Sequence, residues 1–285
     1  MAIFNVAGIQ MPVRPTGGNT DAMLRKAHFA TTVFPATDMI VFSELAPFGP
    51  GIGFATETPE MVEAPFQDFA RNHGVWLCPG SYFVKKDGHV YNHTVMIDPN
   101  GNIAGRYSKM FPFKPFEEGV TAGSEFLVFD VPHVGRFGLS ICYDIWFPET
   151  TRSMVDMGVE VLIHPVLTGT TDRDAEMSVA RATATMFQCY VVDVNGLESG
   201  GVGRSMVIDP VGRVIHQAGQ ASEVFPIEID LELVRRSRRT GSNGLGPPRQ
   251  SFRDSEMTFL VYDPAYRSAY LDSLGPLQKQ QKIPR

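Results

Sequence analysis

Three residues whose side chains are suited to covalent catalysis each follow an apolar segment of the sequence. Glu44 follows MIVFS, Lys109 follows IAGRYS and Cys142 follows RFGLSI. A cysteine sulfur becomes a good nucleophile only as the thiolate, so it needs a base or a positive charge nearby. A carboxylate can carry the proton, and a lysine ammonium can stabilise an oxyanion in a dry pocket. Together the three side chains predict nucleophilic catalysis through an oxyanion.

The predicted position of Cys142 separates it from the other two cysteines. A strand-to-helix turn at Cys142 exposes the sulfur beside backbone N–H donors, at Tyr143 and beyond, which could hold an oxyanion. Cys78 in VWLCPG and Cys189 in MFQCYVVDV lie in apolar segments typical of inert core thiols. Three cysteines in a chain of 285 residues do not make a disulfide framework, so reactivity becomes the feature of interest.

Other kinds of catalytic site find little support in the sequence. It contains no G-x-S-x-G nucleophile motif. His89 and His93 are four residues apart in a predicted strand, where they share a face without a third ligand, so we predict no metal site. The segment SGGVGRS lies between predicted strands instead of opening a helix, which indicates a loop and no dinucleotide site. We therefore expect no cofactor.

The segments that position these residues alternate between apolar strands and amphipathic helices. In the first half we expect a strand at residues 2–10, a helix beginning at Asn19 or Thr20, the strand MIVFSE, a helix at about residues 60–73, the strand VWLCPGSYFV, and two strands joined through DPNG at residues 98–101. The last strand ends at RYSK, which contains Lys109. Ligand sites in α/β folds form at such strand ends.

The second half repeats this order of elements. We expect the strand RFGLSIC, a helix from Pro148 to about Met157, the strand VEVLIHP, a helix from about Asp174 to Gln188, the strand YVVDVN, and two strands meeting at VIDPVG, residues 207–212. Each half reads as β-α-β-α-β-β-β, and VIDPVG corresponds to MIDPNG in the first half. The repeat predicts an α/β fold with pseudo-duplicated halves, two sheets and outer helices.

Composition narrows the expected partners. Hydrophobic residues make up 43% of the chain and charged residues 20%, with a net charge of −6, which is typical of a globular protein. No apolar run approaches the roughly 18 to 20 residues needed to cross a bilayer, and the start MAIFNVAGIQM has no secretory pattern. We expect a cytoplasmic protein with no membrane partner. The acidic balance disfavours nucleic acid, so small molecules are the expected ligands.

The pattern of strands and helices ends after about residue 230. The following segment, RRSRRTGSNGLGPPRQSFRDS, opens with four arginines at Arg235, Arg236, Arg238 and Arg239. Such a run favours a solvated or subunit-contacting face over a nucleic-acid site when the whole chain is acidic.

Three motifs resemble those of the nitrilase, or carbon-nitrogen hydrolase, superfamily. They are FSELA around Glu44, GRYSKMFPF around Lys109 and LSICYDIWFPE around Cys142, and their order and spacing agree over roughly residues 2–230. The resemblance implies a four-layer α-β-β-α sandwich for a catalytic domain at residues 1–230. It also implies a homodimer or higher homo-oligomer, in which the tail at residues 231–285 contacts another subunit.

The same resemblance implies a role for each candidate residue. Cys142 attacks the carbonyl carbon of an amide and forms a thioester, Glu44 acts as general base and then as general acid, and Lys109 stabilises the tetrahedral oxyanion. Members of the family carry a second glutamate after the lysine. Glu117 is the better match for it, and Glu118 is the rival.

The residues after the cysteine bear on the reaction subclass. Cys142-Tyr143-Asp144 is similar to amidase and carbamoylase branches, whereas true nitrilases typically have Cys-Trp-Glu. The resemblance therefore favours hydrolysis of a small amide at a non-peptide C–N bond to a carboxylic acid and ammonia or an amine. N-carbamoyl amine hydrolysis, nitrile hydrolysis and a non-catalytic scaffold of the same fold stay open. Lys114 is either a partner for a substrate carboxylate or a solvated loop lysine.

The predicted pocket lining consists of residues that follow or flank the strand ends. They are Tyr143, Trp146, Phe48, Phe116 and Thr168. For the aromatic side chains, ordinary packing in the core is the equally weighted alternative.

Overall fold

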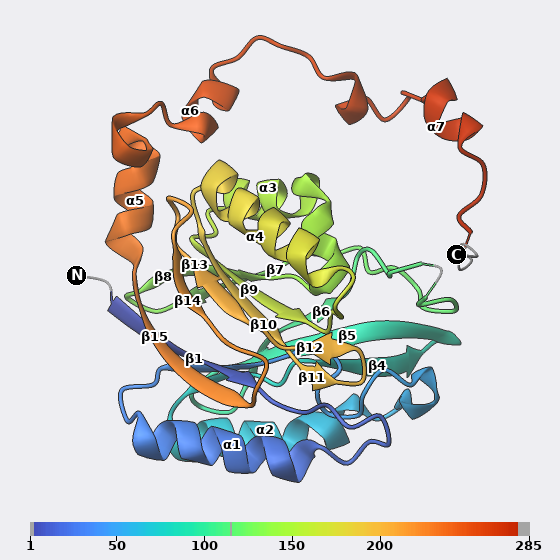
Figure 1. Ribbon diagram of the computed structural model, residues 1–285, viewed down its shortest axis with the longest axis vertical. Helices are drawn as coiled ribbons and strands as arrows, with labels where there is room; N and C mark the ends of the chain where they lie inside the picture. The colour runs from blue at the N-terminus through green and yellow to red at the C-terminus, as the bar shows by residue number, and fades with distance from the viewer. Residues whose placement is uncertain (1–2, 115, 279–285) are drawn as a thin grey trace.

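The computed structural model describes residues 3–114 and 116–278. Two β-sheets lie face to face in the middle of the molecule, and helices cover the outer side of each sheet (Figure 1). The four layers are therefore helix, sheet, sheet and helix. This confirms the predicted α-β-β-α sandwich, in which each sheet buries one face against its partner sheet and the other against helices.

The first sheet contains strands from the first half of the chain and one strand from its end. Its hydrogen-bonded order is β15-β1-β2-β3-β5-β4, and β6 pairs with β5. Strands β1, β2 and β3 are parallel, and helices α1 and α2 make the crossovers on the outer face. The bounds are β1 Ile3–Gln10, α1 Thr20–Val33, β2 Met39–Phe42, α2 Pro59–His73, β3 Trp76–Cys78, β4 Ser81–Lys86, β5 His89–Ile97, β6 Ile103–Ser108 and β15 Glu223–Asp230.

The second sheet has the order β14-β13-β10-β9-β8-β7. Strands β8, β9 and β10 are parallel, with α3 and α4 as crossovers on the outer face. The bounds are β7 Leu127–Val131, β8 Gly135–Leu139, α3 Pro148–Asp156, β9 Val161–Val166, α4 Arg173–Phe187, β10 Tyr190–Asn195, β13 Met206–Ile208 and β14 Val214–Gln217. Two short strands, β11 Leu197–Glu198 and β12 Gly201–Val202, form a hairpin. The second of them lies inside the segment SGGVGRS, which was predicted to be a loop.

The two sheets share one arrangement, as the repeat in the sequence predicts. In each, three parallel strands joined by two helices are followed by antiparallel strands, β5 beside β3 and β13 beside β10. An antiparallel strand also lies on the other side of each parallel set, β15 beside β1 and β7 beside β8. The last strand of the domain therefore completes the sheet of the first half and ties the two halves together.

One predicted strand is wrong in its extent. The segment VWLCPGSYFV forms two strands, β3 and β4, which meet at Gly80. Gly80 has a φ of 75°, and a Cβ at this position would lie 1.9 Å from the carbonyl oxygen of Ser43. A glycine is needed because the chain turns in the left-handed region while passing directly over the backbone that precedes Glu44. The turn thus places Ser81, the first residue of β4, within hydrogen-bond distance of Leu45, shortly after the end of β2.

Apolar side chains fill the space between the sheets and the space under the helices. The central strands β9 and β10 are buried along their whole length because both of their faces are covered. On the outer face of the first sheet, α2 buries Val62, Phe66 and Ala70, which are spaced four residues apart. Each fully buried side chain of the size of Phe66 contributes roughly 2 to 3 kcal/mol. The resulting core holds the strand ends in place.

The sandwich continues into helix α5, Leu231–Thr240. Its Leu231 and Val234 belong to the core between the sheets. Arg235 donates a 2.8 Å hydrogen bond to Glu160, and Arg238 donates to the backbone oxygens of Val159 and Gln188. Two of the four arginines thus fasten α5 to the body of the protein.

Helix α6, Pro248–Arg253, packs against α4, with Arg249 paired to Asp156 and the Arg152 guanidinium 4.4 Å from the centre of the Phe252 ring. The chain beyond α6 extends away from the body (Figure 1). It contains α7 Ala269–Ser273, and most of its side chains are exposed. Residues 279–285 lie outside the described part of the chain. Within the described residues, no helix is both long enough and apolar enough to span a bilayer.

Candidate active site

Glu44 lies where the two sheets meet. It follows β2 by two residues, and its backbone N–H donates a 3.2 Å hydrogen bond to the carbonyl of Val166, the last residue of β9 in the other sheet. The next residue, Leu45, has a φ of 53° and donates from its backbone N–H to the Ser81 hydroxyl. Anchoring on both sheets fixes the direction in which the Glu44 side chain leaves the backbone.

Cys142 occupies a sharp turn after β8. Its φ of 46° is in the left-handed region, which a non-glycine residue rarely adopts, and it begins a short 3-10 helix, Cys142–Trp146. Backbone strain of this kind persists only where surrounding contacts enforce it, and it concentrates at functional sites. The predicted strand-to-helix turn is present, with a 3-10 helix followed by α3 from Pro148.

Asp144 connects the Cys142 turn to the segment that carries Lys109. One carboxylate oxygen accepts hydrogen bonds from the Tyr107 hydroxyl at 2.6 Å and the Ile141 backbone at 3.0 Å, and the other accepts from the Phe111 backbone at 2.8 Å. Burial raises the pKa of Asp144 to about 6, against the opposing effect of these donors. Asp144 is therefore a positioning residue for both neighbouring segments.

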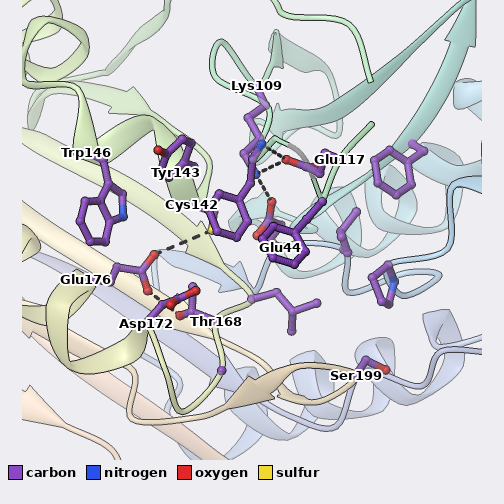
Figure 2. A pocket seen from close by; sticks show the side chains of 17 residues that line it. Glu44, Lys109, Glu117, Cys142, Tyr143, Trp146, Thr168, Asp172, Glu176 and Ser199 are labelled. Atoms are coloured by element: carbon purple, nitrogen blue, oxygen red, sulfur yellow. Dashed lines mark hydrogen bonds and ion pairs between the residues drawn. The ribbon is translucent and has the colours of Figure 1, made fainter. Parts of the chain in front are cut away.

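Lys109 is the centre of a buried network of charged groups (Figure 2). Its ammonium lies 2.9 Å from Glu44 Oε1 and 2.8 Å from Glu117 Oε2. The amide of Asn92 donates to both carboxylates, at 2.9 Å and 3.0 Å. The structure thus brings Glu117 to the lysine, whereas Glu118 is exposed. Asn92 was not foreseen, since an asparagine within a strand has no recognisable motif.

The pKa values of the two carboxylates around Lys109 shift in opposite directions. Burial alone would lower the pKa of Lys109, but the charges of Glu44 and Glu117 hold it well above its usual value. Burial raises the pKa of Glu44, while Lys109 opposes that rise. Burial acts on Glu117 too, yet the charge and hydrogen bond of Lys109 outweigh it and lower the pKa. Glu117 therefore balances the ammonium, and Glu44 is the carboxyl suited to take up and release a proton.

All three cysteine side chains are buried, and their surroundings differ. Burial raises the pKa of Cys78 to about 11 and that of Cys189 to about 12. Burial also raises the pKa of Cys142, and Glu44 adds to the rise while Lys109 opposes it. All three thiols belong to the apolar core, but Cys142 also lines a cavity beside a proton acceptor and a cation, and Cys78 and Cys189 are not among the described lining residues. The resting Cys142 is a thiol that must lose its proton when it attacks.

The cavity has a volume of about 550 Å³. Its lining includes Glu44, Lys109, Glu117 and Cys142, so the structure brings the four predicted catalytic residues to one space. The predicted binding residues Tyr143, Trp146, Phe116 and Thr168 line it as well. A cavity of this size fits a small molecule.

One prediction about the pocket wall needs correction, and the structure favours one of the two alternatives for Lys114. Phe48 does not line the cavity: its ring packs with Val62, Tyr82 and Val84 and stacks on Phe54, and Pro50 lines the cavity from the same loop. The chain turns at Gly49, whose φ is 81° and whose backbone N–H donates to the Leu45 carbonyl at 2.7 Å, and Phe48 packs against Val62 of α2. Lys114 is exposed and is not among the described lining residues, which favours the solvated loop lysine over a partner for a substrate.

Glu176 is a cavity residue that sequence reasoning missed. It is fully buried on α4, and its Oε1 lies 3.8 Å from the Cys142 sulfur (Figure 2). The available signal was its spacing: Arg173, Glu176, Ala180 and Phe187 share the buried face of the helix. Two charged residues on an otherwise apolar helix face indicate a buried ionic contact.

No metal centre accompanies the site within residues 3–114 and 116–278, where no group of three or more acidic, histidine or cysteine side chains could hold an ion. His93 instead hydrogen-bonds Ser108, and burial lowers its pKa to about 4.

Comparisons with known proteins identify the family of this chain. The model of the carbon-nitrogen hydrolase family matches residues 5–239. A 2-oxoglutaramate amidase from Bacillus subtilis is 33% identical over 205 residues, which cover 68% of this chain and 79% of the relative. A nitrilase from Pyrococcus abyssi is 33% identical over 204 residues, covering 69% and 75%. The crystal structure of a carbon-nitrogen hydrolase from Helicobacter pylori shares the fold, with a TM-score of 0.79 and 24% identity over 96% of this chain and 99% of that one. With this match over most of its length, the chain belongs to the carbon-nitrogen hydrolase family.

Proposed function

We propose that the protein is a cofactor-independent amidase, which hydrolyses a small amide at a non-peptide C–N bond through a thioester on Cys142. The observation that carries the proposal is the shared cavity of Cys142, Glu44 and Lys109, with the lysine bonded to the glutamate at 2.9 Å. Amidases among the relatives of this chain support the choice of an amide substrate.

The first half of the reaction forms the thioester. Glu44 takes the proton of the Cys142 thiol as the sulfur attacks the carbonyl carbon. Negative charge develops on the carbonyl oxygen, where the Lys109 ammonium and the backbone N–H of Tyr143 stabilise it. Glu44 then donates the proton to the amide nitrogen, the C–N bond breaks, and ammonia or an amine leaves.

The second half of the reaction returns the enzyme to its starting state. Glu44 removes a proton from a water molecule, and the resulting hydroxide attacks the thioester carbon. Lys109 again stabilises the tetrahedral oxyanion. The C–S bond breaks, the carboxylic acid leaves, and the sulfur recovers a proton from Glu44. Glu117 touches no reacting atom in this scheme and keeps the charge of Lys109 balanced.

The test is ammonia release from aliphatic, amino-substituted, ω-carboxy and aromatic amides, together with carbamoyl compounds and matched nitriles. We expect release from amides by the wild type and none by the Cys142→Ala variant. Release only from carbamoyl compounds, with carbon dioxide, would favour an N-carbamoyl amine hydrolase, and release only from nitriles would favour a nitrilase. No release from any compound, with equally slow iodoacetamide labelling of all three cysteines, would favour a non-catalytic scaffold.

A further inference from the structure

A second buried ionic network lies on the opposite side of Cys142 from Lys109 (Figure 2). Arg173 donates to Glu176 Oε2 at 2.8 Å and to the two carboxylate oxygens of Asp193 at 2.5 Å and 3.2 Å. All three side chains are completely buried. The chemistry proposed above does not use them.

The charges of this network do not cancel. One guanidinium faces two carboxylates, and the other close partners are the neutral Thr168 hydroxyl and the backbone carbonyl of Arg204. The charges of Asp193 and Arg173 both act on His164. Burial nevertheless lowers the pKa of His164 to about 4, so it adds no positive charge near neutral pH. An unbalanced charge in a buried position is costly, and a proton or a further cation would relieve it.

Glu176 is the member of this network that lines the cavity. Glu176 Oε2 already accepts hydrogen bonds from Arg173 and Thr168. Glu176 Oε1 faces the cavity, where its partner is the Cys142 thiol at 3.8 Å, a weak donor. A hydrogen-bond donor on a substrate could therefore reach Oε1 directly beside the nucleophile.

The cavity offers little to a negatively charged substrate. Among the described lining residues, Lys109 is the one with a cationic side chain, and it is already bonded to two carboxylates. Asp172 adds a further acidic side chain to the wall that holds Glu176. The balance of charges thus favours a cation near Glu176 and opposes a carboxylate there.

We propose that Glu176 is a specificity-determining residue, whose Oε1 binds a protonated amino group on the acyl part of the substrate. The substrate class is then an α- or β-amino amide, because Oε1 is so close to the Cys142 sulfur that the ammonium must lie near the carbonyl carbon. The ammonium supplies the positive charge that Arg173 alone does not provide. This inference rests on the proposed amidase function.

The first test compares three amides that differ in charge: β-alaninamide, its neutral analogue butyramide, and succinamate. We expect the wild type to have its highest kcat/KM with β-alaninamide. In Glu176→Gln the ratio of kcat/KM for β-alaninamide over butyramide falls by about tenfold or more, the loss expected for a hydrogen bond to a charged group. Asp174→Asn is the matched control, since Asp174 is an exposed residue of the same helix, and it leaves this ratio within about twofold.

A binding measurement separates this inference from the proposed function. In the Cys142→Ala background, calorimetry is expected to show tighter binding of β-alaninamide than of butyramide, and the added Glu176→Gln change removes the difference. If no amide is hydrolysed but this pattern appears, the amidase proposal fails and the role of Glu176 stands. The inference would be overturned if the wild type preferred butyramide or succinamate, or if it did not bind β-alaninamide. An unchanged ratio of kcat/KM in Glu176→Gln would overturn it as well. If Glu176→Gln does not fold, the substrate preference of the wild type decides.

Discussion

The two ionic networks beside Cys142 have the same composition and different positions. Each contains one cation and two carboxylates: Lys109 with Glu44 and Glu117, and Arg173 with Glu176 and Asp193. The lysine network follows strand ends and lies on segments tied down by backbone hydrogen bonds. The arginine network joins a helix to the middle of β10, inside the second half of the fold.

The difference teaches how one excess negative charge serves two purposes. In the mechanism that we propose, Glu44 of the lysine network takes up the proton of the nucleophile, so the excess negative charge takes part in the reaction. In the arginine network, burial, with the charge of Asp193, raises the pKa of Glu176 to about 7, so that a proton or a cationic ligand can neutralise it. The second imbalance is therefore open to a ligand.

Removing the cation of the lysine network is expected to have the largest effect on turnover. Lys109→Met leaves the oxyanion without its ammonium and places Glu44 beside an unbalanced Glu117, so kcat falls by about a thousandfold. Ammonia release measures the loss, and Lys85→Met is the control because Lys85 pairs with Glu57 at the surface. If Lys109→Met kept more than about a tenth of the wild-type kcat, the two networks would not differ in catalytic importance.

Removing the cation of the arginine network is expected to act mainly on stability. Arg173→Met leaves two buried carboxylates unpaired and costs about 3 to 5 kcal/mol in the free energy of unfolding, measured with denaturant. The triple variant Arg173→Met, Glu176→Gln, Asp193→Asn removes all the charges and recovers most of that loss. Arg204→Met, which loses a partly exposed ion pair with Asp174, costs less than about 1 kcal/mol. A loss below about 1 kcal/mol in Arg173→Met would show that the network is not a structural unit.

The pH dependence of the unfolding free energy tests the raised pKa of Glu176 in the arginine network. The folded pKa of Glu176, about 7, is above its ordinary value of 4.5, so the folded state binds the proton more tightly than the unfolded chain. Stability is therefore lost as pH rises from about 4.5 through 7, and is constant above that range. Glu176→Gln cannot titrate, so its unfolding free energy relative to the wild type increases across this window. A difference that does not change with pH would mean that Glu176 has an ordinary pKa.

Deleting the C-terminal tail, whose described residues contact neither network, is expected to have the smallest effect on stability. Large apolar side chains between residues 257 and 277 are exposed, whereas α5 is anchored by Leu231 and Val234. Deleting residues 254–285 is therefore expected to lower the mass of the assembly in light scattering and to leave the unfolding free energy of the sandwich nearly unchanged. If the mass of the assembly did not change, the prediction that the tail contacts another subunit would be wrong.

The sequence was informative where catalytic residues stand next to strand ends. Glu44, Lys109 and Cys142 each follow an apolar run, and the repeated order of elements predicts the two-sheet architecture. Contacts between distant segments had no comparable pattern. Asn92 lies in the middle of β5 and joins two glutamates from different loops. The pairing of Arg173 with Asp193 in β10 forms only when α4 packs on the sheet, and the direction of Phe48 depends on how its loop folds.

Acid quenching of the wild type during hydrolysis of an amide, followed by mass analysis of its peptides, tests the central claim most directly. The account predicts an increase in mass equal to the acyl group on the peptide that contains Cys142, with Cys78 and Cys189 unmodified. The increase is absent when Cys142→Ala is treated in the same way. Steady ammonia release from the wild type with no acyl group on Cys142 in any quenched sample, or an acyl group found on another residue, would contradict the account.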